Sequence, residues 1–308
     1  MSLTSPLRIG TRGSPLALAQ AHQTRDRLLA AHGLPDDAVE IHIIKTSGDA
    51  ILDRPLSEAG GKGLFTKELD TALMMGGIDI AVHSAKDLPT FLPDAITIAG
   101  YLPREDVRDA WISPVAATPR DLPQGAKVGT ASLRRGAMLK RIRPDVEITL
   151  LRGNVQTRLR KLAEGECAGT LLALAGLNRL GLADRATALL PIDEFLPAAG
   201  QGAIAITARM DDAGVAAMLG PILCAPTGVS LAAERAFLTA LDGSCRTPIG
   251  AHAVAEGDRV RLRGLVLRPD GSEQFEELAE GSAWEADALG KAAGEAIRAR
   301  LPAGFFES

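Results

Sequence analysis

The sequence predicts an α/β protein with two layered lobes and a smaller α+β domain at its C-terminal end. Its 308 residues are enough for about two domains with a small third. Strand and helix signals alternate over the first two thirds, which is typical of layered α/β domains with largely parallel strands. In the last third, two expected strands are grouped between helices, and this pattern favours an α+β arrangement.

The first third begins with a well-marked helix. Ser14 and Pro15 indicate its start, because serine is a preferred N-cap and proline is favoured at the first helical position. Gly33 indicates its end. Apolar periodicity predicts the other elements of this third, which are strands at 7–9, 39–43 and 78–82 and a helix at 64–73.

The second third repeats the alternation. Ser132 is the expected cap of a helix that runs to Lys140. The other elements expected here are strands at 128–130, 146–150, 170–175 and 203–206 and a helix at 155–162. We interpret the polar, proline-containing segment 102–119 as a crossover between lobes and 197–202 as a hinge.

The last third differs in character. Helical spacing of apolar residues predicts helices at 229–241 and 289–301, with strands at 251–255 and 260–267 between them. Arg259, Arg261 and Arg263 occupy alternate positions, which indicates a solvated sheet face without a function. The predicted boundaries are residues 1–102 with 203–220 for the first lobe, 103–202 for the second lobe and 221–308 for the C-terminal domain.

Composition argues against several classes of protein. An aromatic content of 3% and a net charge of -4 argue against nucleic-acid binding. No apolar run approaches the ~20 residues of a membrane span, and residues 1–8 lack the pattern of a secretory signal. The three cysteines are too few for a disulfide framework. We therefore expect a cytoplasmic protein in a reducing compartment.

Two similar segments indicate anion binding. Residues 9–14 and 128–132 both run from a strand end through small and hydroxyl residues into a helix, whose free N–H groups attract anions. Arg12 lies in the first segment, and Arg134 and Arg135 lie in the first turn of the second helix. Cations are disfavoured at a helix N-terminus, and a bound anion would offset that repulsion. The pattern predicts two lobes facing one acidic ligand.

Basic residues are concentrated between 134 and 179, where ten Lys and Arg against four Asp and Glu give a net charge of +6. Arg152 follows an expected strand, at the edge where open α/β sheets bind ligands, and Arg158 lies beside the apolar face of the next helix. Four further basic residues of this segment are expected on a solvated helix surface: Arg141, Arg143, Arg160 and Lys161.

Residues 83–89 follow another expected strand. Asp87 has two interpretations: a local ion pair or cap beside Lys86, or a carboxylate that accepts from N–H groups and stabilises a developing cation. His83 is a weak candidate for a base, and no His or Cys lies near it in the sequence at metal-ligand spacing.

One cysteine stands apart from the others. Cys245 lies in a loop beside Arg246, where exposure and the neighbouring cation favour a lowered thiol pKa and reactivity. Cys167 and Cys224 are interpreted as structural or incidental.

Six segments carry a resemblance to a known family. They are Arg8-Ile-Gly-Thr-Arg-Gly-Ser-Pro-Leu-Ala-Leu-Ala-Gln20, Gly60-Gly-Lys-Gly-Leu-Phe65, Ala81-Val-His-Ser-Ala-Lys-Asp87, Gly129-Thr-Ala-Ser-Leu-Arg-Arg135, Leu151-Arg-Gly-Asn154 and Gly243-Ser-Cys245. In this order, and over nearly the whole chain, they resemble the porphobilinogen deaminase (hydroxymethylbilane synthase) family.

The resemblance implies two periplasmic-binding-protein-like lobes with mixed sheets around a cleft, and a C-terminal domain that carries a cofactor cysteine. It implies a transferase of porphyrin and heme biosynthesis that joins four porphobilinogen molecules into the linear tetrapyrrole hydroxymethylbilane and releases ammonia through an azafulvene. The product grows on a dipyrromethane cofactor, attached by a thioether to Cys245. Each added ring brings two carboxylates, so an arginine-rich cavity is needed to offset their repulsion.

The resemblance also assigns roles to residues. Asp87 is the catalytic residue, in contact with the pyrrole nitrogens. The residues expected to bind substrate are Arg12, Ser14, Lys86, Thr130, Ser132, Arg134, Arg135, Arg152, Arg158 and Arg179. Those expected to bind the cofactor are Ser84, Lys86, Asp87, Arg134, Arg135 and, covalently, Cys245. Lys62 belongs to a loop, 48–65, that is mobile in the family and is expected to cover the cleft. No metal is expected.

Two other classes stay open from the residues alone. A bilobal module that binds or senses a small anion would also use arginines on two lobes, and a nucleic-acid binder is favoured only by the basic segment. Porphobilinogen is the one partner expected, without nucleic acid or membrane, and the chain is expected to be a monomer.

Overall fold

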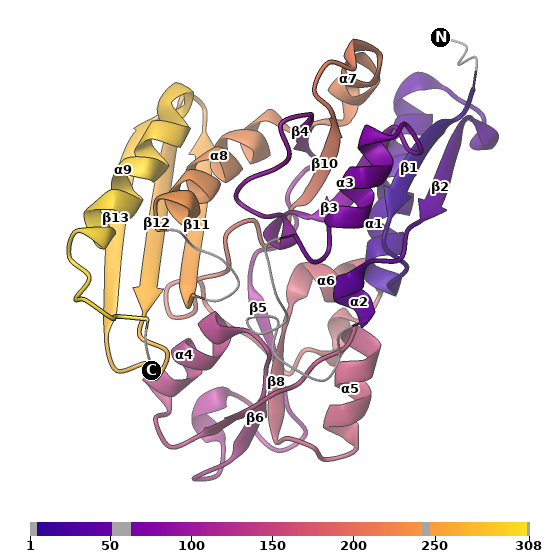
Figure 1. The fold of residues 1–308 in the computed structure, drawn as a ribbon. Coiled ribbons are helices and arrows are strands. Elements are labelled where there is room, and N and C mark those ends of the chain that lie inside the picture. The colour runs from indigo at the N-terminus through magenta and orange to yellow at the C-terminus, as the bar shows by residue number, and fades with distance from the viewer. Residues whose placement is uncertain (1–4, 51–62, 242–246, 307–308) are drawn as a thin grey trace. The chain divides into compact units, whose positions relative to one another are not determined.

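The structure, a computed structural model, describes residues 5–50, 63–241 and 247–306 (Figure 1). The described residues form two compact units. The first comprises those of Met1–Ile51, Gly60–Glu105 and Ala203–Gly228, and the second comprises those of Asp106–Gly202 and Val229–Ser308.

The first unit is built on a five-stranded mixed sheet. Its strand order is β2 (Val39–Ile43), β1 (Leu7–Thr11), β3 (Ile80–Ser84), β10 (Ile204–Arg209) and β4 (Ile96–Tyr101). Strand β1 is parallel to β2 and β3, whereas β10 is antiparallel to β3 and β4. The sheet is therefore mixed, because β10 runs against the other four strands, and this agrees with the mixed sheets that the resemblance implies.

Helices cover both faces of this sheet. Helix α1 (Pro15–His32) packs Leu28 against Ile9 on one face, and α3 (Lys67–Met74) packs Leu69 and Leu73 on the other. The unit also contains α2 (Ser47–Ala50) and α7 (Ala213–Leu219). Because successive strand residues point to opposite faces, the sheet is buried on both sides.

The second unit contains a five-stranded sheet with the same pattern of strand directions. Its order is β7 (Glu147–Thr149), β6 (Lys127–Gly129), β8 (Gly169–Ala173), β5 (Asp109–Ile112) and β9 (Ala188–Leu189). Strand β6 is parallel to β7 and β8, and β5 is antiparallel to β8 and β9. Helices α4 (Leu133–Ile142) and α5 (Val155–Ala163) pack on opposite faces. The two similar segments of the sequence, 9–14 and 128–132, thus occupy equivalent positions in the two sheets.

Two predictions for this sheet are wrong. The segment expected to be only a crossover contains β5, whose four residues are all buried. The strand expected to reach 175 ends at Ala173, where α6 (Leu174–Arg179) begins. Strand β5 was missed because four residues between polar, proline-containing flanks are too few for a period of two to be visible.

The second unit also carries a three-stranded antiparallel sheet. It consists of β11 (Ile249–Glu256), β12 (Arg259–Leu267) and β13 (Gln274–Ser282). Helices α8 (Ala225–Ala240) and α9 (Ala286–Arg298) lie against one face, where Phe237 and Ile297 are fully buried (Figure 1). The sequence pattern missed β13, because much of this strand is polar and acidic.

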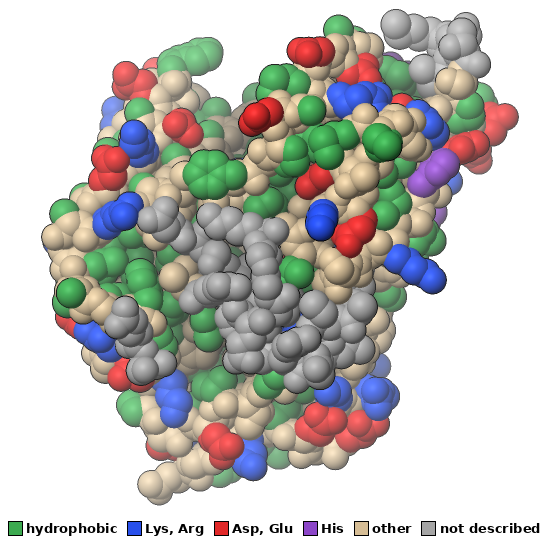
Figure 2. Space-filling view, viewed as in Figure 1, with side chains coloured by type: hydrophobic (Ala, Val, Ile, Leu, Met, Phe, Trp, Pro, Cys, Tyr) green, Lys and Arg blue, Asp and Glu red, His purple; other side chains and the backbone are tan. Residues whose placement is uncertain are grey.

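The charged surface of this small sheet matches its prediction. Arg259 pairs with Glu280, Arg261 with Glu256 and Arg263 with Glu276, at 2.8, 3.1 and 2.7 Å. Figure 2 shows the same intermingling of basic and acidic side chains over the face in view. Within the described residues, no single helix combines the length and apolarity of a membrane span. Only Ala213–Ile222 and Ala225–Ala240, joined across a bend of 108°, do so by length and composition.

Candidate active site

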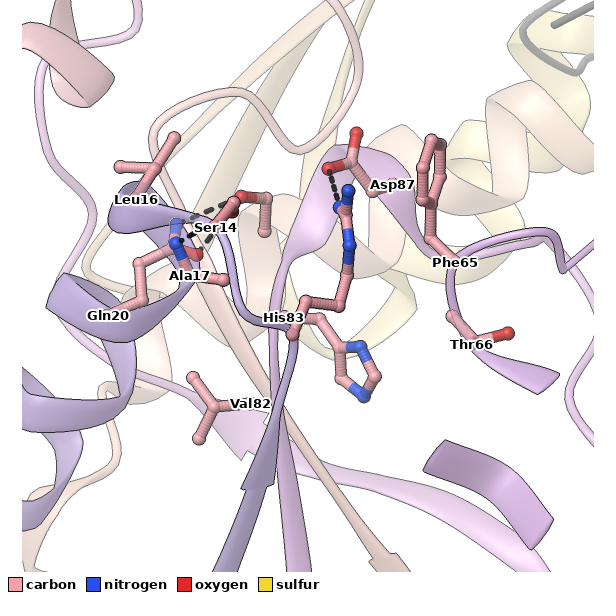
Figure 3. Close-up of a pocket in the computed structure, with 11 residues that line it drawn as sticks. Ser14, Leu16, Ala17, Gln20, Phe65, Thr66, Val82, His83 and Asp87 are labelled. Carbon is pink, nitrogen blue, oxygen red and sulfur yellow. Dashed lines mark hydrogen bonds and ion pairs between the residues drawn. The ribbon is translucent and has the colours of Figure 1, made fainter. Parts of the chain in front are cut away.

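A pocket in the first unit lies where β1 and β3 end. Its lining includes Arg12, Ser14, Gln20, Phe65 and Asp87 (Figure 3). Parallel strands bring their carboxyl ends to one sheet edge, where α/β proteins bind ligands. The pocket volume of about 60 Å³ is well below the ~300 Å³ of a pocket that encloses a small molecule. It has room for only a fragment of such a molecule.

The start of α1 forms one wall of the pocket. Ser14 caps the helix by accepting a hydrogen bond from the Ala17 N–H at 3.3 Å, as predicted. One turn further on, the buried Gln20 donates from Nε2 to the Ser84 Oγ at 2.9 Å. This contact fixes the hydroxyl of Ser84 at the end of β3. Gln20 was not predicted as a site residue, although its spacing from Ala17 and Thr24 places it on the buried face of α1.

Arg12 lies between an aromatic ring and a carboxylate. Its Cζ is 4.0 Å from the centroid of the Phe65 ring. Its Nη1 is 3.9 Å from Asp87 Oδ2, the ion pair dashed in Figure 3, and this distance is too long for a hydrogen bond. The Asp87 side chain is 36% exposed. The Asp87 carboxylate is thus not saturated by Arg12 and is partly open to solvent. It can accept hydrogen bonds from N–H groups of a ligand.

Phe65 also lines the pocket, although no role at the site was predicted for it. It precedes α3 and supplies an apolar wall to the pocket (Figure 3). Its ring and Arg12 form a cation–π pair, which stabilises the position of the guanidinium.

His83 is buried behind the pocket. Its Nε2 lies 3.1 Å from the hydroxyl of Thr207, and the residue is 6% exposed. Burial, together with the positive charge of Arg12, lowers the pKa of His83 to about 4. The imidazole is therefore neutral at neutral pH, and a base with this pKa is poorly matched to proton transfer there.

A second group of site residues surrounds the start of α4 in the second unit. The Arg134 and Arg135 side chains are 4% and 7% exposed, and both bind Asp109, which is fully buried. Arg134 Nη2 donates to Oδ2, and Arg135 Nη2 donates to Oδ1, each at 2.7 Å. Burial raises the pKa of Asp109, but the two guanidinium charges outweigh it and hold the pKa well below its usual range.

Asp109 changes the interpretation of these arginines. The sequence predicted that an external anion offsets their position at a helix N-terminus, whereas the structure supplies an internal carboxylate for both. Asp109 was not predicted as a site residue. Its signal was a charged residue directly before the apolar run Ala110-Trp111-Ile112, since a buried charge requires a partner.

The hydroxyl residues lie beside this cluster. Thr130 Oγ1 accepts from the Ser132 N–H at 3.1 Å, and Ser132 Oγ accepts from the Arg135 N–H at 3.4 Å. Ser132 is therefore the cap of α4, as predicted. The structure brings Thr130, Ser132, Arg134 and Arg135 together.

The remaining predicted arginines bind backbone or are buried. Arg152 is 8% exposed, after β7. Arg158 Nε donates to the Gly153 carbonyl, and Arg179 Nη2 donates to the Gly202 carbonyl, both at 2.8 Å. These contacts fix where the two side chains lie.

The arginines expected on a solvated surface differ among themselves. Arg141 is exposed, and Arg160 pairs with Glu164 at 2.9 Å on the surface. Lys161 lies 3.7 Å from Glu166. Arg143 does not fit the expectation, because its side chain is 16% exposed and donates to Asp145 and to backbone carbonyls of residues 119–123.

Each unit thus presents its own polar group. Arg12, Ser14, Ser84 and Asp87 gather in the first unit, with Lys86 next to Asp87 in a short 3-10 helix, Ala85–Asp87. Cys245 and Lys62 lie outside the described residues. Within the described ranges, no group of three or more His, Cys, Asp and Glu side chains is arranged to hold a metal.

The donor set fits a dipyrromethane bearing carboxylates. Arg134 and Arg135 share one aspartate, which leaves that cluster with a net charge of +1. The Nε of Arg134 is buried without a hydrogen-bond partner among the described residues. Cationic N–H donors of this kind match acetate and propionate groups.

The fold and these groups define an α/β protein with basic sheet-edge sites for an acidic ligand. Residues 7–217 match the family model "Porphobilinogen deaminase, dipyromethane cofactor binding domain", and residues 229–299 match "Porphobilinogen deaminase, C-terminal domain". The chain belongs to the porphobilinogen deaminase family, whose members are transferases with a cofactor attached to a cysteine.

Curated relatives support the same assignment. The porphobilinogen deaminase of Nitrobacter hamburgensis is 59% identical over 298 residues, which cover 97% of this chain and 94% of the relative. That of Paracoccus denitrificans is 55% identical over 303 residues, covering 98% and 97%.

Solved structures of solute-binding proteins are similar at low identity. The periplasmic aliphatic sulphonate binding protein of Escherichia coli has a TM-score of 0.42 and 16% identity, covering 77% of this chain and 70% of that one. A periplasmic substrate-binding protein of an ABC transporter from Coxiella burnetii has a TM-score of 0.44 and 14% identity, covering 74% and 96%.

Proposed function

We propose that this chain is a hydroxymethylbilane synthase, which joins porphobilinogen molecules into a linear tetrapyrrole and releases ammonia. The observation that carries the proposal is the match of both family models, one after the other, over residues 7–217 and 229–299. Identities of 55–59% over nearly the whole chain support the same activity.

Asp87 is the proposed catalytic residue. Loss of ammonia from the aminomethyl arm leaves positive charge on the pyrrole ring, and a nearby carboxylate stabilises that charge. The Asp87 side chain is partly exposed at the pocket and accepts from the pyrrole N–H. Arg12 lies 3.9 Å away and holds the position of this carboxylate.

The basic residues bind the carboxylates of the substrate and of the growing product. Arg12, Ser14 and Lys86 serve this role in the first unit, and the second unit contributes Thr130, Ser132, Arg134, Arg135, Arg152, Arg158 and Arg179. Guanidinium groups suit the task because their paired N–H donors match the two oxygens of a carboxylate. A pocket of about 60 Å³ has room for only a part of one pyrrole, so binding residues beyond its lining, such as Arg134 and Arg135, are also needed.

Ser84, Lys86, Asp87, Arg134 and Arg135 are the proposed ligands of the dipyrromethane, with Cys245 as its covalent attachment. When bound, this cofactor supplies the free pyrrole carbon to which the first substrate is joined. The side chains already described orient it: Gln20 fixes Ser84, and Asp109 fixes the two arginines.

The experiment is turnover of porphobilinogen by the purified protein, followed by ammonia release and by tetrapyrrole formation. The wild type should form both products in step. Asp87→Asn should lower kcat about 100-fold or more, because the charge that stabilises the transition state is removed. Asp94→Asn is the matched control, since Asp94 is exposed in the same unit and should retain normal kcat.

Two outcomes would contradict the proposal. One is binding of porphobilinogen by the wild type without release of ammonia, which would favour a small-anion binding module. The other is a normal kcat for Asp87→Asn, which would remove Asp87 from its catalytic role while leaving the activity in place.

We also propose a monomeric, cytoplasmic enzyme with lobes at 1–102 with 203–220 and 103–202 and a C-terminal domain at 221–308, acting without nucleic acid or membrane. The free thiols of Cys167 and Cys224 support a reducing compartment. Each of the three sheets falls within one of these domains. Strand β10 lies in 203–220 and belongs to the sheet of the first lobe. Sedimentation equilibrium should give the mass of one chain, and a dimer mass would contradict the monomer.

A further inference from the structure

Asp109 is a buried carboxylate to which the proposed mechanism gives no direct task. It is the first residue of β5, and its backbone is fixed on both sides. Asp109 pairs with Ala173 of β8, and its carbonyl accepts from the Leu190 N–H at 2.9 Å. With its side chain 0% exposed, it has no contact with solvent.

Three side chains saturate this carboxylate. Oδ2 accepts from Arg134 Nη2 at 2.7 Å, and Oδ1 accepts from Arg135 Nη2 at 2.7 Å and Nε at 3.1 Å. Gln201 Nε2 donates to Oδ1 at 3.0 Å and to the Val107 carbonyl at 2.8 Å. Because each carboxylate oxygen holds a different arginine, rotation of the Asp109 side chain would release both.

Other contacts hold the far sides of the two guanidinium groups. Arg134 Nη1 donates to the Leu196 carbonyl at 2.7 Å, and Arg135 Nη1 donates to the Leu171 carbonyl at 3.0 Å. Each guanidinium is thus clamped between a carbonyl and Asp109. Such clamps fix orientation before a ligand binds, which lowers the cost of binding it.

The charges of the cluster do not balance. Two guanidinium groups and one carboxylate leave +1, close to the positive end of the α4 dipole. A buried charge without a partner is costly, and Arg134 Nε is a buried donor with no hydrogen-bond partner within the described residues. The cluster therefore has charge for one more carboxylate. Without Asp109, it would carry +2.

We propose that Asp109 is a positioning residue, which orients Arg134 and Arg135 and limits the positive charge that they present to the carboxylates of an acidic ligand. Gln201 supports it by fixing one carboxylate oxygen. The identity of the ligand rests on the proposed function, whereas the role of Asp109 as internal counter-ion does not.

The first test replaces the counter-ion with a small one from solution. Asp109→Ala should lower the Tm, and added formate at fixed ionic strength should raise it again, because a free carboxylate fits the space left between two guanidinium groups. The wild-type Tm should not respond to formate. This measurement is independent of enzyme activity.

The second test removes the charge and keeps the shape. Asp109→Asn should lower kcat/KM for porphobilinogen about 100-fold, because misplaced binding groups cost this much. The fraction of purified protein that carries the covalent mass of the cofactor should fall with it. The matched control is Asp79→Asn, because Asp79 also bridges two arginines, Arg8 at 2.8 Å and Arg209 at 3.4 Å. Asp79 lies before β3, at the opposite end of that strand from Ser84. The control should lower the Tm and leave kcat/KM and the cofactor mass unchanged.

Several results would overturn the proposal. They are a Tm of Asp109→Ala that formate does not raise, a normal kcat/KM for Asp109→Asn, or equal losses in Asp79→Asn. Failure of both Asp109 variants to fold would also overturn it, because the carboxylate would then be needed for folding. A wild type without turnover and without cofactor mass would contradict the proposed function alone, since the formate response would still decide the role of Asp109.

Discussion

Arg12 shows how one side chain can serve two neighbours at once. Its Cζ lies over the Phe65 ring, 4.0 Å from the centroid, and Asp87 lies 3.9 Å from Nη1. The ring attracts the charge of the guanidinium without using its N–H donors, so the two contacts do not compete. This geometry positions a cation next to the proposed catalytic carboxylate and leaves them separated by more than a hydrogen bond.

His83 allows a test of the environment behind this pocket. Its pKa is about 4 in the folded protein, lowered by burial and then by Arg12, against 6.5 for the unfolded chain. Above pH 6.5 both states hold a neutral imidazole. As the pH falls from 6.5 to 4, only the unfolded state gains the proton, so the free energy of unfolding decreases.

We predict that His83 accounts for a loss of about 3 kcal/mol over this pH range, from a pKa difference of about 2.5. Urea unfolding at pH 7 and pH 4.5 should show a smaller loss in His83→Gln than in the wild type. Glutamine has an amide that can also bond to Thr207, so the comparison isolates the proton. Equal pH dependence in the two proteins would show that the imidazole titrates normally.

At the scale of elements, the same strand–loop–helix unit occurs twice. Strand β1 leads into α1 with Ser14 as its cap, and β6 leads into α4 with Ser132 as its cap. The sheets around them have the same pattern of strand directions, with one antiparallel strand at the fourth position, although the order of the strands along the chain differs. Each unit therefore places a serine and an arginine near free N–H groups at a sheet edge, a general way to bind anions.

Ser132 is predicted to have two roles, cap and ligand contact. Ser132→Ala should lower the free energy of unfolding by about 1 kcal/mol through loss of the cap and should raise KM. Ser132→Asn restores a good cap, so urea unfolding should return to the wild-type value. KM should stay raised, because the amide does not reproduce the hydroxyl. Recovery of both quantities would reduce Ser132 to a helix cap.

The sequence predicted most elements because local chemistry decides them. The start and end of α1 follow from Ser14, Pro15 and Gly33, whose conformations are local properties. Strands β5 and β13 were missed for opposite reasons, one being very short and the other largely polar. Both are defined by pairing with neighbouring strands, which no local pattern encodes.

In the molecule as a whole, the site residues divide in the same way, into those that a local pattern predicts and those that only tertiary packing brings to the site. The arginines were found because their positions oppose a helix dipole, which is visible in sequence. Asp109 was missed because its contacts with Arg134 and Arg135 join residues 25 and 26 positions apart through the packing of β5 on α4. Gln20 and Phe65 likewise reach the pocket only through tertiary packing.

The charge distribution explains how a protein of net charge -4 can bind an acidic product. Much of the basic segment 134–179 is neutralised locally, by pairs such as Arg143 with Asp145 and Arg160 with Glu164. The face in Figure 2 shows this mixing of signs. Arg134 and Arg135, by contrast, share one buried carboxylate and keep a net charge of +1, and the low dielectric of this buried site strengthens their attraction for carboxylates.

The proposed function requires these arginines to serve an acidic pyrrole chain that is tethered to the protein by sulfur. Intact-mass measurement of the purified protein decides whether this chain is present. The wild-type mass should exceed the sequence mass by two linked pyrrole units, and this excess should be lost in Cys245→Ser and kept in the control Cys224→Ser, because the Cys224 thiol is free. A fully active wild type with no excess mass, or an excess that persists in Cys245→Ser, would show that no such tether exists at Cys245.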